Sequence, residues 1–162
     1  MLPTHAFLRF NIDSNSALLK QLKPHYILVG LNISKKIEKH LANFHGSGGG
    51  AYKIRFALRG TPLWGAYMTD IIKDFEQKMS GQVMRYLRTN KIFEKENIES
   101  FRKEINDLGV KDPTIVAFGR DVYTILSRNF RNEFEIFKIP HYSTYMSKEK
   151  YRVDVKSILG FS

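Results

Sequence analysis

The stretch PHYILVGLNIS, from Pro24 to Ser34, decides the fold. Its apolar run from Tyr26 to Val29 closes at Gly30, and the polar side chains of Asn32 and Ser34 follow. A short run rich in Ile and Val that ends in a glycine is typical of a buried parallel strand. Ligands in open α/β sheets bind outside the carboxyl ends of such strands. The stretch therefore predicts a core strand that opens into a site.

A second strand-like run, from Phe134 to Ile139, also ends in polar groups. It is followed by Pro140, His141, Tyr142 and Ser143. Parallel strands expose their carboxyl ends at one edge of a sheet. We therefore expect the ends of these two runs to meet in one pocket.

Strands and helices alternate between these two runs. Strands are predicted over residues 63–69 and 114–118, whereas residues 52–58 fit either an alternating strand or a short basic helix. The helical patterns cover residues 35–44, 80–87, 97–108, 121–126 and 147–159, with N-caps at Ser80, Asn97, Asp121 and Ser147. This order predicts a single domain over residues 1–162, a three-layer α/β/α sandwich with a mostly parallel four-stranded central sheet.

Composition agrees with a globular domain and indicates an anionic partner. The chain has 162 residues, of which 43% are hydrophobic and 13% aromatic, and this suits one sizeable core. Its formal net charge is +10, which favours a nucleic acid or, less often, an anionic membrane surface, although solubility alone also explains such a charge.

Several classes of site are excluded by residue type. The chain has no cysteine, so disulfides, thiolate zinc sites and iron-sulfur clusters are excluded. His40 and His45 have no carboxylate at ligand spacing, so we expect no metal and no cofactor. The sequence shows neither an apolar run long enough to span a membrane nor a signal peptide, and we expect a cytoplasmic monomer.

Two short motifs carry a resemblance to a known family. Gly30-Leu31-Asn32 and His141-Tyr142-Ser143, with AYMTDII between them, resemble the motifs of the uracil-DNA glycosylase superfamily. The first is of the type G-x-D/N-P and is closest to the mismatch-specific branch, and the second is of the type H/N-P-S. Ile33 and Tyr142 stand where these motifs carry proline.

The resemblance implies a DNA base-excision N-glycosylase that hydrolyses the glycosidic bond of a flipped uracil or related damaged base. Asn32 would position the attacking water through its side-chain carbonyl, and His141 would donate a hydrogen bond to the base oxygen that becomes anionic. Asn32 cannot take a proton as a carboxylate does, so the reaction is expected to be slower than in branches that carry Asp. No lysine is marked as a Schiff-base nucleophile, which predicts a monofunctional enzyme.

The flipped base needs a flat face and a polar reader. Phe44 is the first choice for the stacking ring, with Tyr67 and Trp64 behind it, and the alternative is that all three are core aromatics. Asp70 stands where many members place the asparagine that reads the base. A carboxylate favours a base edge with an amino group, and a protonated acid favours one like that of uracil. The alternative for Asp70 is a helix cap.

Contacts with the nucleic acid are expected after the second motif. Ser143 would bind a phosphate beside the flipped nucleotide, and Tyr145 and Met146 would fill the gap left by the extruded base. Lys148 and Arg152 would lie along the phosphate backbone of DNA, or of RNA.

Two other functions are compatible with the predicted fold, and a glycine-rich segment invites comparison with a phosphate-binding loop. The same fold would serve a nucleic-acid-binding module that does not cut, or a hydrolase of free nucleosides or nucleotides; the charge of +10 argues against the small substrate. The glycine run at residues 46–50 lacks the Lys-Ser/Thr of a phosphate-binding loop and is interpreted as a surface loop.

Overall fold

A computed structural model of the chain describes residue 20, residues 22–34, residue 44 and residues 50–161. Its sheet contains four parallel strands in the order β2-β1-β3-β4: β1 (Lys23–Gly30), β2 (Ala66–Asp70), β3 (Thr114–Phe118) and β4 (Ile136–Ile139). The helices of the described part are α2 (Ala51–Leu58), α3 (Ser80–Thr89), α4 (Lys91–Asp107), α5 (Arg120–Phe130) and α6 (Lys148–Ile158). The predicted α/β class with a parallel four-stranded sheet is confirmed.

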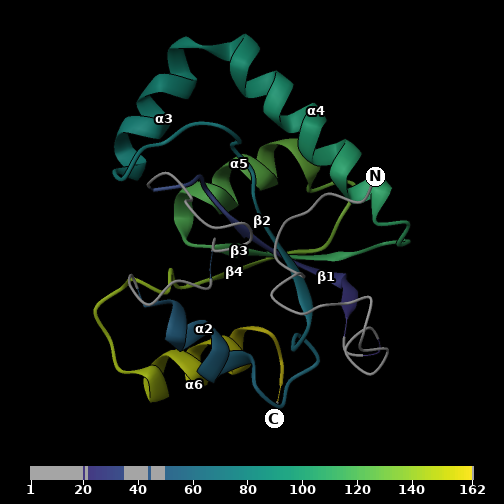
Figure 1. Cartoon of the computed structure of the whole chain (residues 1–162), viewed down its shortest axis with the longest axis vertical. Coiled ribbons are helices and arrows are strands. Elements are labelled where there is room, and N and C mark those ends of the chain that lie inside the picture. Colours follow the sequence, from purple (N-terminus) through teal and green to yellow (C-terminus); the bar gives the residue numbers. More distant parts are fainter. Residues whose placement is uncertain (1–19, 21, 35–43, 45–49, 162) are drawn as a thin grey trace, which may run out of the picture.

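The helices cover both faces of the sheet. Figure 1 shows α2 and α6 side by side on one face, and α3, α4 and α5 on the other, with α3 and α4 joined at the top of the view. This arrangement is the predicted three-layer α/β/α sandwich. It leaves the carboxyl ends of all four strands at one edge, because every strand pair is parallel.

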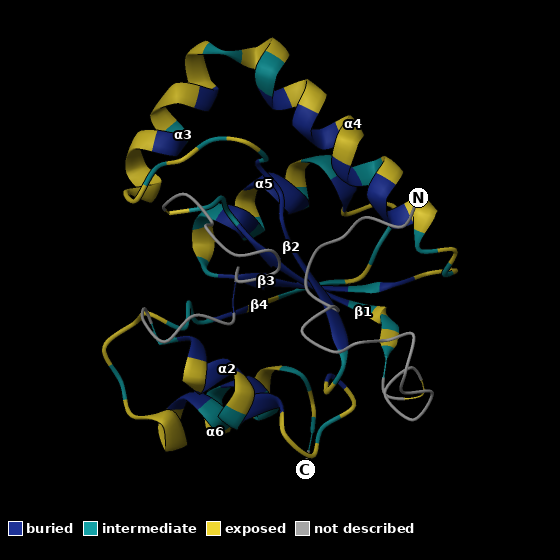
Figure 2. Cartoon of the chain, in the orientation of Figure 1, coloured by how far each residue is buried: buried dark blue, intermediate teal, exposed yellow. Residues whose placement is uncertain are grey.

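Each strand divides its side chains between the two cores. Ile27 and Val29 of β1 pack on the side of α4 and α5, and Leu28 packs on the side of α2 and α6. β2, β3 and the second half of β1 are dark blue in Figure 2 because both faces of the sheet are covered there. A strand buried on both faces needs a continuous apolar sequence, which is why the YILV run of β1 is not alternating.

Residues 51–58 form a helix, and this resolves the alternative left open by their pattern. Ile54, Ala57 and Leu58 are buried, whereas Tyr52 and Arg55 are exposed. Spacings of three and four residues between buried positions are those of one helix face. The alternating aromatic and basic residues were therefore misleading evidence for a strand.

Three of the predicted N-caps are wrong. The helix predicted to start at Asn97 begins at Lys91, and Asn97 is buried inside α4. Its Oδ1 accepts the backbone N–H of Lys73 at 2.6 Å, so a tertiary hydrogen bond explains this asparagine. Ser80 and Asp121 lie in the first turns of α3 and α5 instead of at their caps.

The remaining boundaries agree in part with the predictions. Ser147 is confirmed as a cap, because its Oγ accepts the N–H of Lys150 at 3.1 Å. The strand predicted over residues 63–69 begins at Ala66, after a turn in which Ala66 N–H donates to the carbonyl of Leu63. The helix predicted over residues 35–44 falls outside the described residues, except for Phe44.

Candidate active site at the carboxyl edge of the sheet

The two motifs lie at the same edge of the sheet, with one strand between them. Gly30 at the end of β1 pairs with Asp70 at the end of β2, and Phe118 at the end of β3 pairs with Ile139 at the end of β4. Since β3 separates β1 from β4, Asn32 and His141 contact different segments, and no hydrogen bond joins them directly. The two motifs therefore share the carboxyl edge of the sheet, with the end of β3 between them.

Asn32 is held by its amide nitrogen. Its Nδ2 donates to the backbone carbonyls of Ile33, Phe75 and Gln77, each at 2.8 Å. An aspartate here would present an oxygen to these three carbonyls, so the surroundings explain an asparagine at this position. With the nitrogen committed, Oδ1 is the group of Asn32 that is able to accept a hydrogen bond from a ligand or a water.

His141 has a defined hydrogen-bonding direction. Its Nδ1 accepts the backbone N–H of Ser143 at 3.2 Å and lies 2.7 Å from the Oγ of Ser143. Burial lowers the pKa of His141 below its usual value, which favours the neutral imidazole at pH 7. In a neutral ring whose Nδ1 accepts, Nε2 carries the proton and is a donor. The ring of Tyr142 stacks on the imidazole with centroids 4.3 Å apart.

Stability is expected to fall as the pH drops from 7 to 5. The unfolded chain binds a proton on residue 141 near pH 6.5, whereas the folded chain binds it only at a lower pH, so acid favours unfolding between these two pKa values. Urea unfolding of the wild type and of His141→Gln at both pH values measures this contribution, and the variant should lose less stability. His25→Gln, at an exposed histidine, is the control. Equal losses in the wild type and His141→Gln would contradict the assignment.

Phe44 and Asp70 meet over Gly30. A Cβ added to Gly30 would lie 2.2 Å from Asp70 Oδ1 and 3.0 Å from the Phe44 ring. Both side chains are buried, so the base-binding candidates Phe44 and Asp70 are brought together at the end of β1. The Phe44 ring lies 6.1 Å from that of Phe118.

Tyr142 links this group to the second motif. Its ring packs edge-on against Phe118 with centroids 5.3 Å apart, and it also stacks on the imidazole of His141. Burial, with a smaller contribution from the negative charge of Asp70, raises the pKa of Tyr142 to about 12. Tyr142 therefore stacks on the histidine and is close enough to the buried carboxylate of Asp70 for its charge to act on the hydroxyl.

Tyr67 and Trp64 are placed away from Phe44. Tyr67 is buried on the opposite face of the sheet, where its hydroxyl donates to Glu104 of α4. Burial and then the charge of Glu104 raise the pKa of Tyr67 above its usual value. Trp64 lies in the turn before β2, at the amino edge, and is partly exposed. The structure gives neither ring a position to stack on a base beside Phe44.

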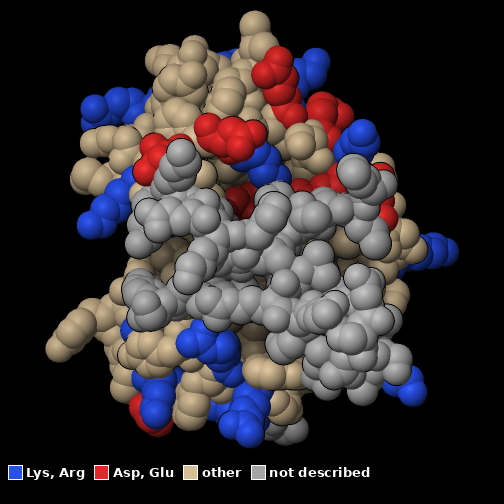
Figure 3. All heavy atoms as spheres, viewed as in Figure 1, with Lys and Arg blue, Asp and Glu red and all other residues tan. Residues whose placement is uncertain are grey.

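The expected DNA contacts divide into exposed and packed residues. Ser143 and Tyr145 are exposed, whereas Met146 packs against the core under α2 and α6. The Nζ of Lys148 lies 5.0 Å from the centre of the Phe56 ring, and Arg152 donates to the carbonyl of Phe56 at 2.7 Å. Figure 3 shows Lys and Arg side chains gathered over α2 and α6. Arg152 therefore joins these two helices as well as adding charge to their surface.

Sequence reasoning missed two residues that hold the second motif. Lys53 is buried, and its Nζ donates to the carbonyl of Thr144 at 2.8 Å. Gly50 has φ +84°, and a Cβ there would lie 2.5 Å from the carbonyl oxygen of Tyr142. The start of α2 is thus packed directly against residues 142–144. The glycine run was the available signal, since close backbone approach is a common reason for glycine.

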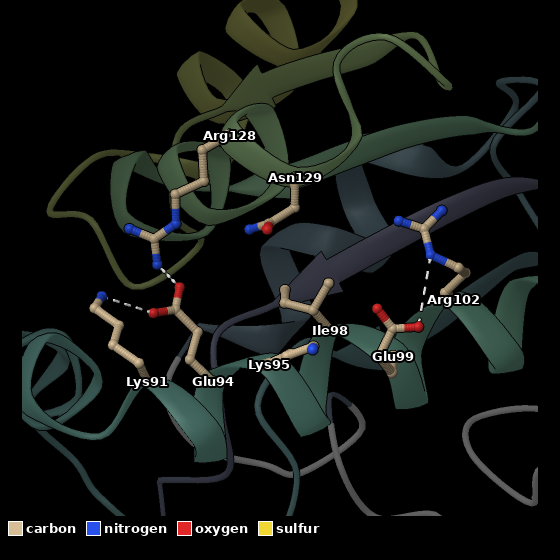
Figure 4. Close-up of a pocket in the computed structure, with 8 residues that line it drawn as sticks. All are labelled: Lys91, Glu94, Lys95, Ile98, Glu99, Arg102, Arg128 and Asn129. Carbon is tan, nitrogen blue, oxygen red and sulfur yellow. Dashed lines mark hydrogen bonds and ion pairs between the residues drawn. The ribbon is translucent and has the colours of Figure 1, made fainter.

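A pocket of about 470 Å³ lies elsewhere, between α4 and α5. Figure 4 shows Lys91 and Arg128 converging on Glu94, with Lys95, Ile98 and Asn129 around them. Glu94 is buried, so both cations compensate its charge, and Arg128 of α5 thereby joins the two helices. No residue of either motif lines this pocket.

The described residues provide neither a cluster of metal ligands nor a membrane-spanning helix. Within the described residues, no group of three or more His, Asp or Glu side chains is arranged to hold a metal ion. No helix in that part of the chain is long and apolar enough to cross a membrane.

Comparisons of the chain with protein families, with curated proteins and with solved structures found no match. The class that the structure defines is a three-layer α/β/α domain with polar groups at the carboxyl edge of a parallel sheet. The function is therefore argued from the site itself.

Proposed function

We propose that the chain is a monofunctional N-glycosylase that hydrolyses the bond between a flipped base, uracil or a related damaged base, and its sugar in DNA. Asn32 and His141 are the catalytic pair in this proposal. We also propose that the chain is related to the uracil-DNA glycosylase superfamily, because Asn32 and His141 belong to the two motifs that carry the resemblance.

The observation that carries the proposal is the direction of two sets of hydrogen bonds. Asn32 commits its Nδ2 to backbone carbonyls, which leaves an acceptor for the attacking water. His141 accepts through Nδ1, which leaves an Nε2–H donor for the base oxygen that gains charge. Glycosidic hydrolysis needs an acceptor on the water side and a donor on the leaving-group side. Each side chain has the polarity that its proposed role requires.

Phe44 and Asp70 are the proposed base-binding residues. Their common position next to Gly30 supports a subsite with an aromatic face and a carboxylate. Stacking on such a ring suits any base, whereas the carboxylate selects the edge that is presented to it. Ser143 and Tyr145, exposed after the second motif, are available to the flanking backbone.

Excision assays test the proposal directly. Single- and double-stranded oligonucleotides that contain uracil, hypoxanthine or mismatched thymine are incubated with the protein, and abasic sites are then cleaved with alkali. We expect strand breaks on at least one substrate, and only after alkali, because a monofunctional enzyme leaves the backbone intact. Binding without breaks on any substrate would contradict catalysis and favour the non-catalytic binding module, to which the Tyr142 ring stacked on His141 also lends support.

The catalytic pair predicts a matched set of variants. His141→Ala and Asn32→Ala should each lower the single-turnover rate about 100-fold, since one aimed hydrogen bond in a transition state contributes on the order of 3 kcal/mol. His25→Ala and Asn106→Ala replace exposed residues of the same types outside the site and should keep the wild-type rate. Full activity in His141→Ala would remove the histidine from the mechanism.

A further inference from the structure

The sequence from Gln77 to Phe93 is basic throughout. It contains Lys78, Arg85, Arg88 and Lys91 and has no Asp or Glu, although the exposed Asp74 and Glu76 precede it. Lys91 pairs with Glu94 at 3.0 Å. The other three cations are exposed and form no ion pair within the described part of the chain. Three exposed cations that form no ion pair in the described part give the stretch from Lys78 to Arg88 a local positive charge.

Exposed apolar side chains accompany these cations. Of the ten residues of α3, only Val83 and Leu87 are buried. Tyr86 is 38% exposed, and its ring packs 4.7 Å from that of Phe75. Met79 and Ile92, at 61% and 77%, are still more exposed. Cationic groups beside an accessible aromatic ring are the combination with which proteins hold nucleic-acid strands.

This surface is joined to the candidate site. The carbonyls of Phe75 and Gln77 accept the Nδ2 of Asn32, and the N–H of Gln77 donates to the carbonyl of Ile33 at 3.1 Å. The segment that fixes Asn32 therefore leads directly into α3. Figure 1 shows α3 at the upper left of the molecule, on the face of the sheet opposite α2 and α6.

We infer that Lys78, Arg85 and Arg88, here called the α3 surface, bind the phosphate backbone of a nucleic acid. The charge of the surface is complementary to a polyanion, and its continuity with Asn32 places it on the other side of the site from Lys148 and Arg152. A strand that crosses the carboxyl edge of the sheet then meets cations from both faces. The inference rests on the nucleic-acid binding that the proposed function requires and does not depend on hydrolysis.

The test is the salt dependence of binding to undamaged DNA. Fluorescence anisotropy with a labelled duplex at several salt concentrations gives the slope of the logarithm of the association constant against log [salt]. This slope is negative, and its magnitude decreases by about 0.9 for each phosphate contact that is lost. Arg85→Ala/Arg88→Ala should make the slope less steep by about two and weaken binding about tenfold at moderate salt. Both side chains are exposed, and thermal unfolding checks that the variant is folded.

A second double variant controls for net charge. Arg59→Ala/Arg131→Ala removes two exposed arginines that follow the C-terminal ends of α2 and α5, at the amino edge of the sheet. We expect its slope to stay close to that of the wild type. Equal slopes in the two double variants, or an unchanged slope in Arg85→Ala/Arg88→Ala, would overturn the inference. Because the duplex contains no damaged base, a failure of the excision assays leaves this result interpretable.

Discussion

Replacing Glu104 with alanine is expected to lower the free energy of unfolding by about 3 kcal/mol. The carboxylate is buried on α4, where it accepts the hydroxyls of Tyr67 and Thr69 and pairs with Lys73 at 2.8 Å. Its removal takes the shared acceptor away from these groups, and breaking a buried pair of this kind costs about 3 to 5 kcal/mol. The lower figure applies because the Lys73 side chain is 23% exposed and retains some hydration.

Urea unfolding measures this loss, and Glu99→Ala is its matched control. Glu99 lies on the same helix, but its side chain is 61% exposed and its carboxylate forms a long ion pair with Arg102, at 4.0 Å. An exposed pair of this kind contributes less than about 1 kcal/mol. If the two variants lose the same stability, the buried cluster does not hold α4 on the sheet. A large loss in Glu104→Ala alone would identify this cluster as the main polar link between β2 and α4.

β1 and β3 were predictable because burial on both faces leaves a plain signal. The strand predicted over residues 114–118 has the bounds of β3, and the YILV run lies within β1. A short continuous apolar run rich in Ile and Val is typical of a strand that is covered on both faces. The helix at residues 51–58 was not decided by its own pattern, since its exposed Tyr52 sits among the apolar positions. Only packing against α6 distinguishes its buried side.

The residues of the candidate site that lie at strand ends were predictable. It was harder to predict to which face of the sheet a side chain within a strand points. Asp70 and Gly30 lie at neighbouring strand ends, as their motifs indicated. Tyr67, three residues before Asp70, faces the opposite side of the sheet, because successive side chains of a strand alternate between its faces. Applying this alternation to β2 separates residues 67 and 69 from residues 68 and 70. That step would have excluded Tyr67 from the group around Phe44.

The polar links between distant segments left no local signal. Asn97 resembled a helix cap because asparagine favours caps, yet its side chain binds Lys73, 24 residues earlier. Lys53 belongs to a segment whose pattern fitted a short basic helix, yet it is buried and donates to the carbonyl of Thr144, 91 residues later. Partners so far apart in sequence are specified by the fold, so no pattern within a short window predicts them.

Gly30→Ala is the substitution from which we expect the largest combined effect on stability and activity. The new methyl group would lie 2.2 Å from Asp70 Oδ1 and 3.0 Å from the ring of Phe44, well inside van der Waals contact. Both neighbours are buried, so at least one of them must move into a packed core. Overpacking of this kind costs about 1 to 3 kcal/mol, and displacing the proposed base-binding residues should lower excision at least about 100-fold.

Gly81→Ala separates this clash from the general effect of replacing glycine. A Cβ at Gly81, in the first turn of α3, meets no atom within 4 Å, so that variant should gain about 0.5 kcal/mol from the better helix former and keep its activity. Urea unfolding and the excision assay are measured on both. If Gly30→Ala were as stable and as active as Gly81→Ala, Asp70 and Phe44 would have room to move without consequence. The end of β1 would then not be the place where the base is held.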